Sequence, residues 1–304
     1  MIIFYGIITN KKDITQMVYD KCSKEGIVFI PASDVHRAQI FGDPLPNVLK
    51  SIFINNIEYL NINIYIEQNN VYTNVVPDNV LQVYNIDIYK YKLDKLHQKL
   101  KLNFGSFKDE YPEQLMAIKY LKGNEKVLEI GGNIGRNSLI IGSIVEKLVT
   151  LETDQNIVKQ LTYNRDINNM KFLIENSALS NRRLIQRGWD TIPSDIILPG
   201  FFEVKTISWH NLYEKYNIVF DTLVLDCEGA FYYILMDMPE ILTNINLIIM
   251  ENDYNDIEHK KYVDYVLLKN NFYNEYKEAG GWGPCTNNFF EVWKKDENLI
   301  KKDN

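Results

Sequence analysis

The chain has 304 residues, 24% of them charged and 46% hydrophobic, which suits one large folded domain or two ordinary ones. Its formal net charge of −7 argues against a nucleic-acid backbone as the main partner, because phosphate binding needs clustered Lys and Arg. No apolar run approaches the roughly 18 residues of a membrane span. We therefore expect neither a nucleic-acid nor a membrane partner.

The three cysteines, Cys22, Cys227 and Cys285, lie far apart and form no CxxC pair. They indicate neither a zinc site nor a disulfide framework, and a reducing compartment suits them best. The first residues, MIIFYGIITNKK, lack the basic front and the small-residue cleavage site of a signal peptide. A cytoplasmic location is expected.

Residues 1–85 are predicted to form a small β-rich domain with little helix, because short apolar runs alternate with turn residues. Within it, Gly42, Pro44 and Pro46 predict an irregular loop over residues 33–46. The polar side chains of this loop either contact a glycan or a partner, or brace the loop by hydrogen bonds. They are Asp34, His36, Arg37 and Asp43.

Residues 86–111 are predicted to form a helical linker, because leucines recur there at helical spacing with lysines on the other face. Residues 112–304 follow as a second domain. In that domain apolar strand candidates alternate with helical patterns, which predicts a parallel sheet with helices on both faces. We expect an α/β, doubly wound, Rossmann-like domain with a flap over residues 182–207 and a terminal antiparallel hairpin.

The second domain is organised around residues 126–139, KVLEIGGNIGRNSL, which read as a buried strand, a glycine turn and the start of a helix. Glu129, Gly131 and Gly135 give the pattern acidic-x-Gly-x-x-x-Gly. A dinucleotide fingerprint would need Gly-x-Gly-x-x-Gly, which this stretch does not supply. The spacing is the form used by S-adenosylmethionine (SAM) enzymes of the doubly wound class, although plain helix–strand packing can also produce a glycine turn.

Acidic residues stand at the carboxyl ends of four of the five predicted parallel strands, where open sheets of this kind bind ligands. They are Glu129, Glu152, Asp226 with Glu228, and Glu251 with Asp253. Glu152 is placed to accept the ribose hydroxyls of an adenosine ligand. The methionine end of SAM would meet Glu129 and the Gly131–Gly135 backbone, with Asn133 fixing the turn or touching the ligand. The adenine edge would rest on Asn176, Ser177 and Ala178.

The order and spacing of five segments over roughly residues 112–294 resemble the FkbM-type family of SAM-dependent methyltransferases. The segments are KVLEIGGNIGRNSL, TLETD, ENSALSN, TLVLDCEGAFYYIL and LIIMEND. The resemblance implies methylation of a hydroxyl group, often on a sugar or a polyketide-type product. Gly132 departs from the family, which usually has Ala there, and should loosen the turn without abolishing binding. The flap and the GGWGPC hairpin resemble those of viral and marine-microbial relatives that are associated with glycan modification. If the chain is a viral protein, the expected location is the host cytoplasm.

A sugar hydroxyl is a poor nucleophile at neutral pH and benefits from a general base. The candidates are Asp226, Glu228, Glu251 and His259. The ordinary pKa of a histidine suits a general base, but the polar neighbours of His259 are typical of an exposed helix start. The carboxylates could instead hold Mg²⁺, an alternative that we do not favour.

The sequence therefore predicts a SAM-dependent O-methyltransferase acting on a saccharide or glycan, without a resident metal. The alternatives are an RNA or cap methyltransferase and a catalytically silent assembly module with the same fold. Residues 1–85 are similar to an accessory domain of large DNA viruses, and could support a homo-oligomer.

Overall fold

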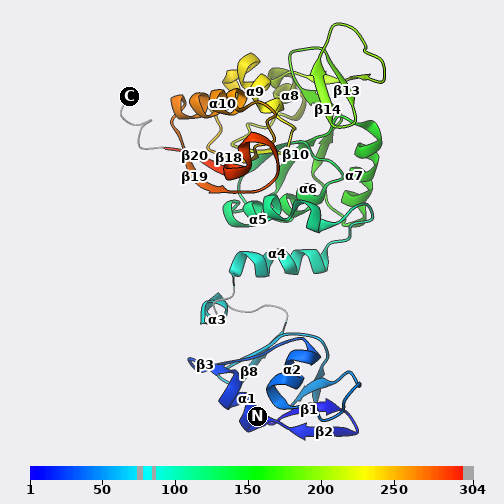
Figure 1. Ribbon diagram of the computed structural model, residues 1–304, viewed down its shortest axis with the longest axis vertical. Coiled ribbons are helices and arrows are strands. Elements are labelled where there is room, and N and C mark those ends of the chain that lie inside the picture. Colours follow the sequence, from blue (N-terminus) through cyan, green and yellow to red (C-terminus); the bar gives the residue numbers. More distant parts are fainter. Residues whose placement is uncertain (74–77, 84–86, 297–304) are drawn as a thin grey trace. The chain divides into compact units, whose positions relative to one another are not determined.

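A computed structural model describes residues 1–73, 78–83 and 87–296, and the chain divides into two compact units, Met1–Tyr91 and Lys92–Asn304 (Figure 1). The predicted boundary between residues 85 and 86 lies outside the described residues. None of the helices in the described part is long and apolar enough to cross a membrane.

The first unit contains two four-stranded antiparallel sheets, in the orders β2-β1-β5-β6 and β3-β4-β7-β8. Their strands are β1 (Ile3–Ile7), β2 (Asn10–Asp13), β3 (Ser23–Lys24), β4 (Ile27–Ile30), β5 (Ser51–Ile54), β6 (Ile57–Tyr59), β7 (Ile64–Glu67) and β8 (Asn70–Tyr72). Three helices accompany them: α1 (Thr15–Cys22), α2 (Asp34–Phe41) and α3 (Asp78–Val83). The β-rich character expected of this region is confirmed.

Helix α2 corrects the prediction of an irregular loop over residues 33–46. Ser33 caps its start by accepting the His36 N–H, and Gly42 ends it at a φ of 76°, so the prolines lie beyond the helix. The buried Arg37 side chain donates to the carbonyls of Pro31 and Ile62, at 2.6 and 2.8 Å. Bracing therefore accounts for this side chain without a ligand.

The second unit is built on a seven-stranded sheet in the order β11-β10-β9-β17-β18-β20-β19. All its strands are parallel except β20, which runs antiparallel to both neighbours. The strands are β9 (Lys126–Ile130), β10 (Lys147–Leu151), β11 (Leu173–Glu175), β17 (Thr222–Leu225), β18 (Leu247–Glu251), β19 (Phe272–Glu278) and β20 (Phe290–Lys295). The predicted α/β fold with a central, mostly parallel sheet and a terminal antiparallel hairpin is confirmed.

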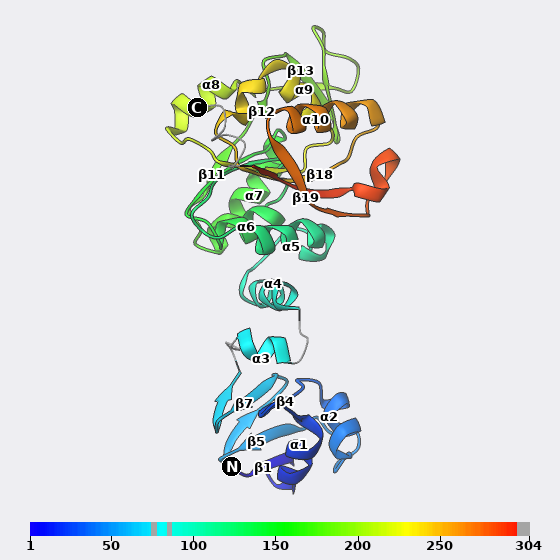
Figure 2. The ribbon, with the colours of Figure 1, turned by 90° about the vertical axis from the view of Figure 1, so that its left-hand side faces the viewer.

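Helices cover both faces of this sheet, with α5, α6 and α7 on one side and α9 and α10 on the other (Figures 1 and 2). The helices of the unit are α4 (Ile88–Lys99, which begins in the first unit), α5 (Tyr111–Tyr120), α6 (Arg136–Gly142), α7 (Gln155–Ile167), α8 (Trp209–Tyr216), α9 (Ala230–Asp237) and α10 (Ile257–Lys269). Short 3₁₀ helices add η1 (Phe107–Glu110), η2 (Pro239–Thr243) and η3 (Gly283–Asn288).

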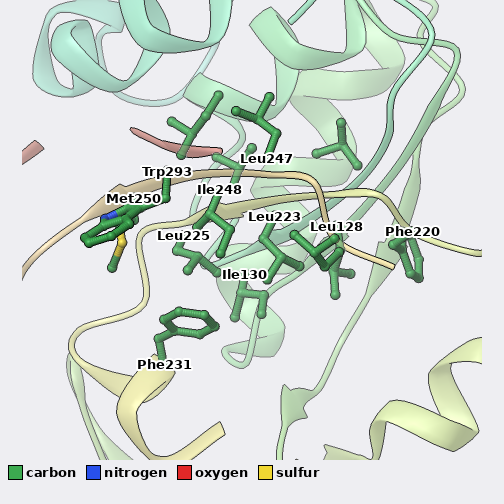
Figure 3. Packing of buried hydrophobic residues seen from close by; sticks show 14 of the residues in the cluster. Leu128, Ile130, Phe220, Leu223, Leu225, Phe231, Leu247, Ile248, Met250 and Trp293 are labelled. Atoms are coloured by element: carbon green, nitrogen blue, oxygen red, sulfur yellow. The ribbon is translucent and has the colours of Figure 1, made fainter. Parts of the chain in front are cut away.

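The core of the second unit is formed by the central strands, which are buried on both faces as parallel strands require (Figure 3). Leu128, Leu223 and Ile248, on three neighbouring strands, are each fully buried. Because β9 pairs in parallel with β10 on one side and with β17 on the other, the carboxyl ends of these three strands lie side by side.

The insertion between β11 and β17 contains a separate three-stranded antiparallel sheet in the order β14-β13-β15, which we call the flap. Its strands are β13 (Leu184–Arg187), β14 (Asp190–Pro193) and β15 (Phe202–Val204). A short parallel pair, β12 (Ala178–Leu179) with β16 (Thr206–Ile207), ties the root of the flap to the loop after β11.

Candidate active site

A cavity of about 240 Å³ opens where β9, β10 and β17 end, and the flap and α9 form its other walls. Of the residues predicted from the sequence, seven line it: Gly131, Asn133, Glu152, Ser177, Ala178, Asp226 and Glu228. The site lies at the switch in strand order between β9 and β17, where doubly wound sheets bind their ligands.

The glycine turn has no room for side chains. Gly131 has a φ of +95°, and a Cβ there would lie 1.6 Å from the Asp226 carbonyl oxygen. A Cβ on Gly132 would lie 2.2 Å from the Thr150 hydroxyl oxygen. Glycine at position 132 therefore does more than loosen the turn, because Thr150 fills the space that an alanine would need.

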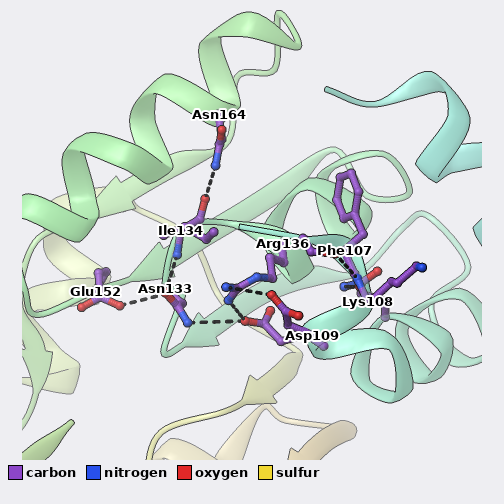
Figure 4. Close-up of polar contacts among 11 residues, drawn as sticks. Phe107, Lys108, Asp109, Asn133, Ile134, Arg136, Glu152 and Asn164 are labelled. Carbon is purple, nitrogen blue, oxygen red and sulfur yellow. Dashed lines mark hydrogen bonds and ion pairs between the residues drawn. The ribbon is translucent and has the colours of Figure 1, made fainter. Parts of the chain in front are cut away.

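Glu152, directly after β10, is hydrogen-bonded to the glycine turn (Figure 4). Its carboxylate accepts the N–H of Asn133 at 2.9 Å and that of Asp154 at 2.8 Å. Burial raises the pKa of Glu152, and these two backbone donors oppose the rise. The ribose-binding candidate is thus held rigidly against the turn while it lines the cavity.

Asn133 fixes the turn with its side chain as well as its backbone. It adopts a φ of 45°, its Oδ1 accepts the Ile134 N–H at 2.8 Å, and its Nδ2 donates to Glu110 at 3.4 Å. Glu110 also pairs with Arg136 at 2.6 Å, on the first turn of α6 (Figure 4). Both predicted roles of Asn133, bracing and lining, are compatible with its position.

Glu129, predicted to meet the methionine end of the cofactor, is not among the residues that line the cavity. Its side chain is 1% exposed and accepts a hydrogen bond from the Ser138 hydroxyl of α6. Complete burial raises its pKa to about 8, so a neutral carboxyl prevails at pH 7. Glu129 braces β9 against α6.

Gly135 also stands back from the cavity lining. It caps the N-terminus of α6 at a φ of +92°, and a Cβ there would lie 2.4 Å from Leu161 of α7. Its role is close helix packing. Asn176 is likewise turned away, because its Nδ2 donates to the carbonyls of Glu152 and Thr153, at 2.9 and 3.0 Å. Asn176 holds the end of β10 in place.

Asp226 and Glu228 are the two base candidates that the structure brings to the cavity. Burial and the surrounding carboxylates, Glu110 first among them, raise the pKa of Asp226 well above its ordinary value. Burial, helped by Asp190 of the flap, raises the pKa of Glu228. A carboxylate with a raised pKa is a stronger base once deprotonated.

Glu251 and His259 do not line the cavity, so the structure gives no support to them as the base. Burial and a hydrogen bond with Glu113 raise the pKa of Glu251 to about 11, which keeps it protonated at neutral pH. The His259 ring stacks on Tyr232 with centroids 3.8 Å apart. Among the described residues no group of three or more His, Cys, Asp or Glu side chains is arranged to hold a metal ion.

Several residues of the flap and of α9 line the cavity without having been predicted as ligand contacts: Arg182, Gln186, Tyr233 and Asp237. Arg182 donates two hydrogen bonds to Asp237, at 2.5 and 2.7 Å, and its guanidinium lies over the Tyr233 ring. The alternation of Leu184 and Gln186 along β13 is the sequence signal that places these two side chains on a common face of the strand. Trp189 also lines the cavity.

The chain matches no protein-family model and no curated protein. Among solved structures it is similar to a ribosomal protein L11 methylase from Lactobacillus delbrueckii subsp. bulgaricus, with 12% identity over 64% of this chain and 81% of that chain and a TM-score of 0.37. An rRNA methylase from Streptococcus thermophilus shares 10% identity over 61% and 94% of the chains, with a TM-score of 0.38. A protein of the NADB-Rossmann superfamily from Streptococcus agalactiae shares 12% over 60% and 67%, with a TM-score of 0.41. Likenesses this distant decide neither the cofactor nor the substrate of this chain.

Proposed function

We propose that the chain is a SAM-dependent methyltransferase acting on a hydroxyl group of a saccharide or glycan. One observation supports SAM as the cofactor. Glu152 and the glycine turn line the same cavity, and the Asn133 N–H donates to the Glu152 carboxylate at 2.9 Å. A carboxylate at the end of the second strand suits a ribose diol, and a backbone without Cβ atoms suits close approach of the rest of the ligand.

We assign the residues around the cavity to the parts of SAM by their chemistry. Glu152 would take the ribose hydroxyls, the Gly131 turn the amino-acid end, and Ser177 with Ala178 the base. When bound, SAM supplies a methyl group on a positively charged sulfonium centre.

Asp226 and Glu228 would orient the acceptor hydroxyl and take its proton. Both line the cavity, and the pKa of each is raised, which makes each carboxylate a stronger base once it is deprotonated. Positioning of the hydroxyl against the methyl group would supply the rest of the rate enhancement.

An uncharged acceptor suits the walls of the cavity. In the described lining Arg182 is the single Lys or Arg side chain, and it is paired with Asp237. A polyanion such as RNA would meet carboxylates there instead of cations. The saccharide itself rests on the FkbM resemblance of the motifs and on the exposed aromatic ring of Trp189 at the cavity wall.

Isothermal titration calorimetry with SAM and S-adenosylhomocysteine tests the cofactor. We expect binding by the wild type and a loss of about tenfold or more in Glu152→Ala, because a hydrogen bond to a charged group is removed. Glu146→Ala, at an exposed position outside the cavity, is the matched control. Thermal unfolding without ligand checks that Glu152→Ala still folds.

No binding by the folded wild type would favour the silent assembly module and contradict the proposal. Undiminished binding by Glu152→Ala would contradict the ribose assignment. Methyl transfer from radiolabelled SAM to a panel of oligosaccharides, with total RNA in a parallel reaction, tests the acceptor class. Label in the RNA alone would overturn the saccharide.

A further inference from the structure

One face of the flap hairpin forms a wall of the cavity. Along β13 the side chains alternate, so Leu184 and Gln186 share a face, and both line the cavity. Across the hairpin, Pro193 pairs with Leu184 and Thr191 with Gln186, and these two residues line the cavity as well. The wall therefore has an apolar half nearer the root of the flap and a polar half nearer its tip.

Gln186 presents a polar atom of this wall, its side-chain carbonyl oxygen, that has no hydrogen-bond partner. Its side chain is 5% exposed, and its Nε2 donates to the Gly188 carbonyl at 3.1 Å, which fixes the orientation of the amide. The Oε1 atom is buried and accepts no hydrogen bond. A buried acceptor without a donor is costly, and a ligand that brings an N–H or O–H would relieve that cost.

The strand order indicates which part of the ligand reaches this wall. β10, which carries Glu152 at its end, lies between β9 with its glycine turn and β11. If the ribose lies at Glu152 and the amino-acid end at the turn, the base extends towards the end of β11. There Leu179 leads into the flap, and the β12–β16 pair ties the two together.

The surroundings of Gln186 suit a flat, uncharged group. Leu179 and Leu184 on the flap side and Ile234 and Met238 from the α9 side contribute apolar surface to the same cavity. Arg182 is neutralised by Asp237 at 2.5 Å, so the wall offers no free cation to a phosphate or a carboxylate. A purine with a hydrogen-bond donor at its edge matches both halves of the wall.

We propose that the side-chain carbonyl of Gln186 accepts a hydrogen bond from the exocyclic amino group of adenine, so that the flap reads the base of the cofactor. The inference rests on the proposed function, because it presupposes an adenosine ligand with its ribose at Glu152. It assigns specificity for adenine to the inserted flap and not to Asn176, whose amide is committed to the end of β10.

The test compares the binding of S-adenosylhomocysteine with that of S-inosylhomocysteine, in which a carbonyl oxygen replaces the amino group. By calorimetry the wild type should prefer the adenosine compound by about tenfold or more, because the carbonyl of Gln186 would face a second acceptor. In Gln186→Met, which keeps the length of the side chain, the preference should fall to about twofold or less. Ile192→Ala, on the outer face of the flap, is the control for flap integrity.

The outcomes separate the two proposals. If the wild type binds neither compound, the proposed function itself is wrong, and this inference falls with it. If it binds S-adenosylhomocysteine but Gln186→Met keeps the full preference, the base is read elsewhere and only this inference is overturned. An unchanged preference together with a raised KM for an oligosaccharide would place Gln186 at the acceptor, which also overturns the adenine assignment.

Discussion

Arg182 at the root of the flap and Asp237 at the end of α9 are joined by two hydrogen bonds, of 2.5 and 2.7 Å, and both residues line the cavity. Both side chains are partly exposed, at 32% and 21%, so the pair contributes about 1 kcal/mol or less to global stability. The pair instead acts locally, because it holds the start of the flap against α9, which forms another wall of the cavity.

The first prediction concerns this fastening. Asp237→Ala should speed proteolytic cleavage within the flap severalfold and weaken the binding of S-adenosylhomocysteine, while the midpoint of chemical unfolding changes little. Arg183→Ala is the matched control, because it breaks the flap's exposed ion pair with Glu203 and leaves the cavity untouched. Equal cleavage rates in the wild type and in Asp237→Ala would show that the pair does not hold the flap.

The second prediction concerns Gly132 and Thr150. Gly132→Ala should lower the free energy of unfolding by about 1–3 kcal/mol, because the new Cβ would overlap the Thr150 hydroxyl at 2.2 Å. In the Thr150→Ala background the same change should cost less, with a coupling energy of about 1 kcal/mol or more. Chemical denaturation of the four proteins of the cycle measures it, and additive effects would contradict the steric explanation.

The third prediction is a pH dependence from the Glu113–Glu251 pair. Burial and Glu113 raise the folded-state pKa of Glu251 from 4.5 to about 11, so the folded chain keeps a proton that the unfolded chain releases. Its stabilising contribution is complete below pH 4.5 and is lost as the pH rises towards 11.

Glu251→Gln keeps a hydrogen-bonding partner for Glu113 and cannot titrate. Between about pH 6 and pH 9 the unfolding free energy of this variant should fall less steeply than that of the wild type, by up to about 1.4 kcal/mol per pH unit. Glu240→Gln, at an exposed position, should keep the wild-type slope. Urea denaturation at several pH values provides the measurement, and parallel slopes for Glu251→Gln and the wild type would contradict the assignment.

The fourth prediction concerns the base. Asp226→Asn or Glu228→Gln should lower methyl transfer to an oligosaccharide about 10²- to 10⁴-fold while the affinity for SAM is retained. Since the pKa of Asp226 is raised, wild-type turnover should increase with pH to values above the ordinary range of an aspartate. His259→Phe preserves the stacking on Tyr232 and should leave turnover unchanged. Full turnover in both carboxylate variants would remove these residues from the mechanism.

Most strands and helices of the second unit could be predicted from the sequence, because local residue patterns indicate them. The buried runs at β9, β17 and β18, the glycine turn and the acid after β10 are all set by residues close together in the chain. Helix α2 was not predicted, although the residue that caps it and the glycine that ends it are both present in the sequence. Pro44 and Pro46, which lie beyond the helix, led to the prediction of a loop.

The sequence by itself determined the α/β alternation and the presence of acids at the strand ends, since both follow from side-chain periodicity and turn chemistry. Only the tertiary structure decided which acids share the cavity, because that depends on the direction of each side chain. Glu129 alternates with Ile130 on β9, so Ile130 lines the cavity while Glu129 is turned towards Ser138. The flap likewise meets α9 through the long-range contact of Arg182 with Asp237, which no local pattern encodes.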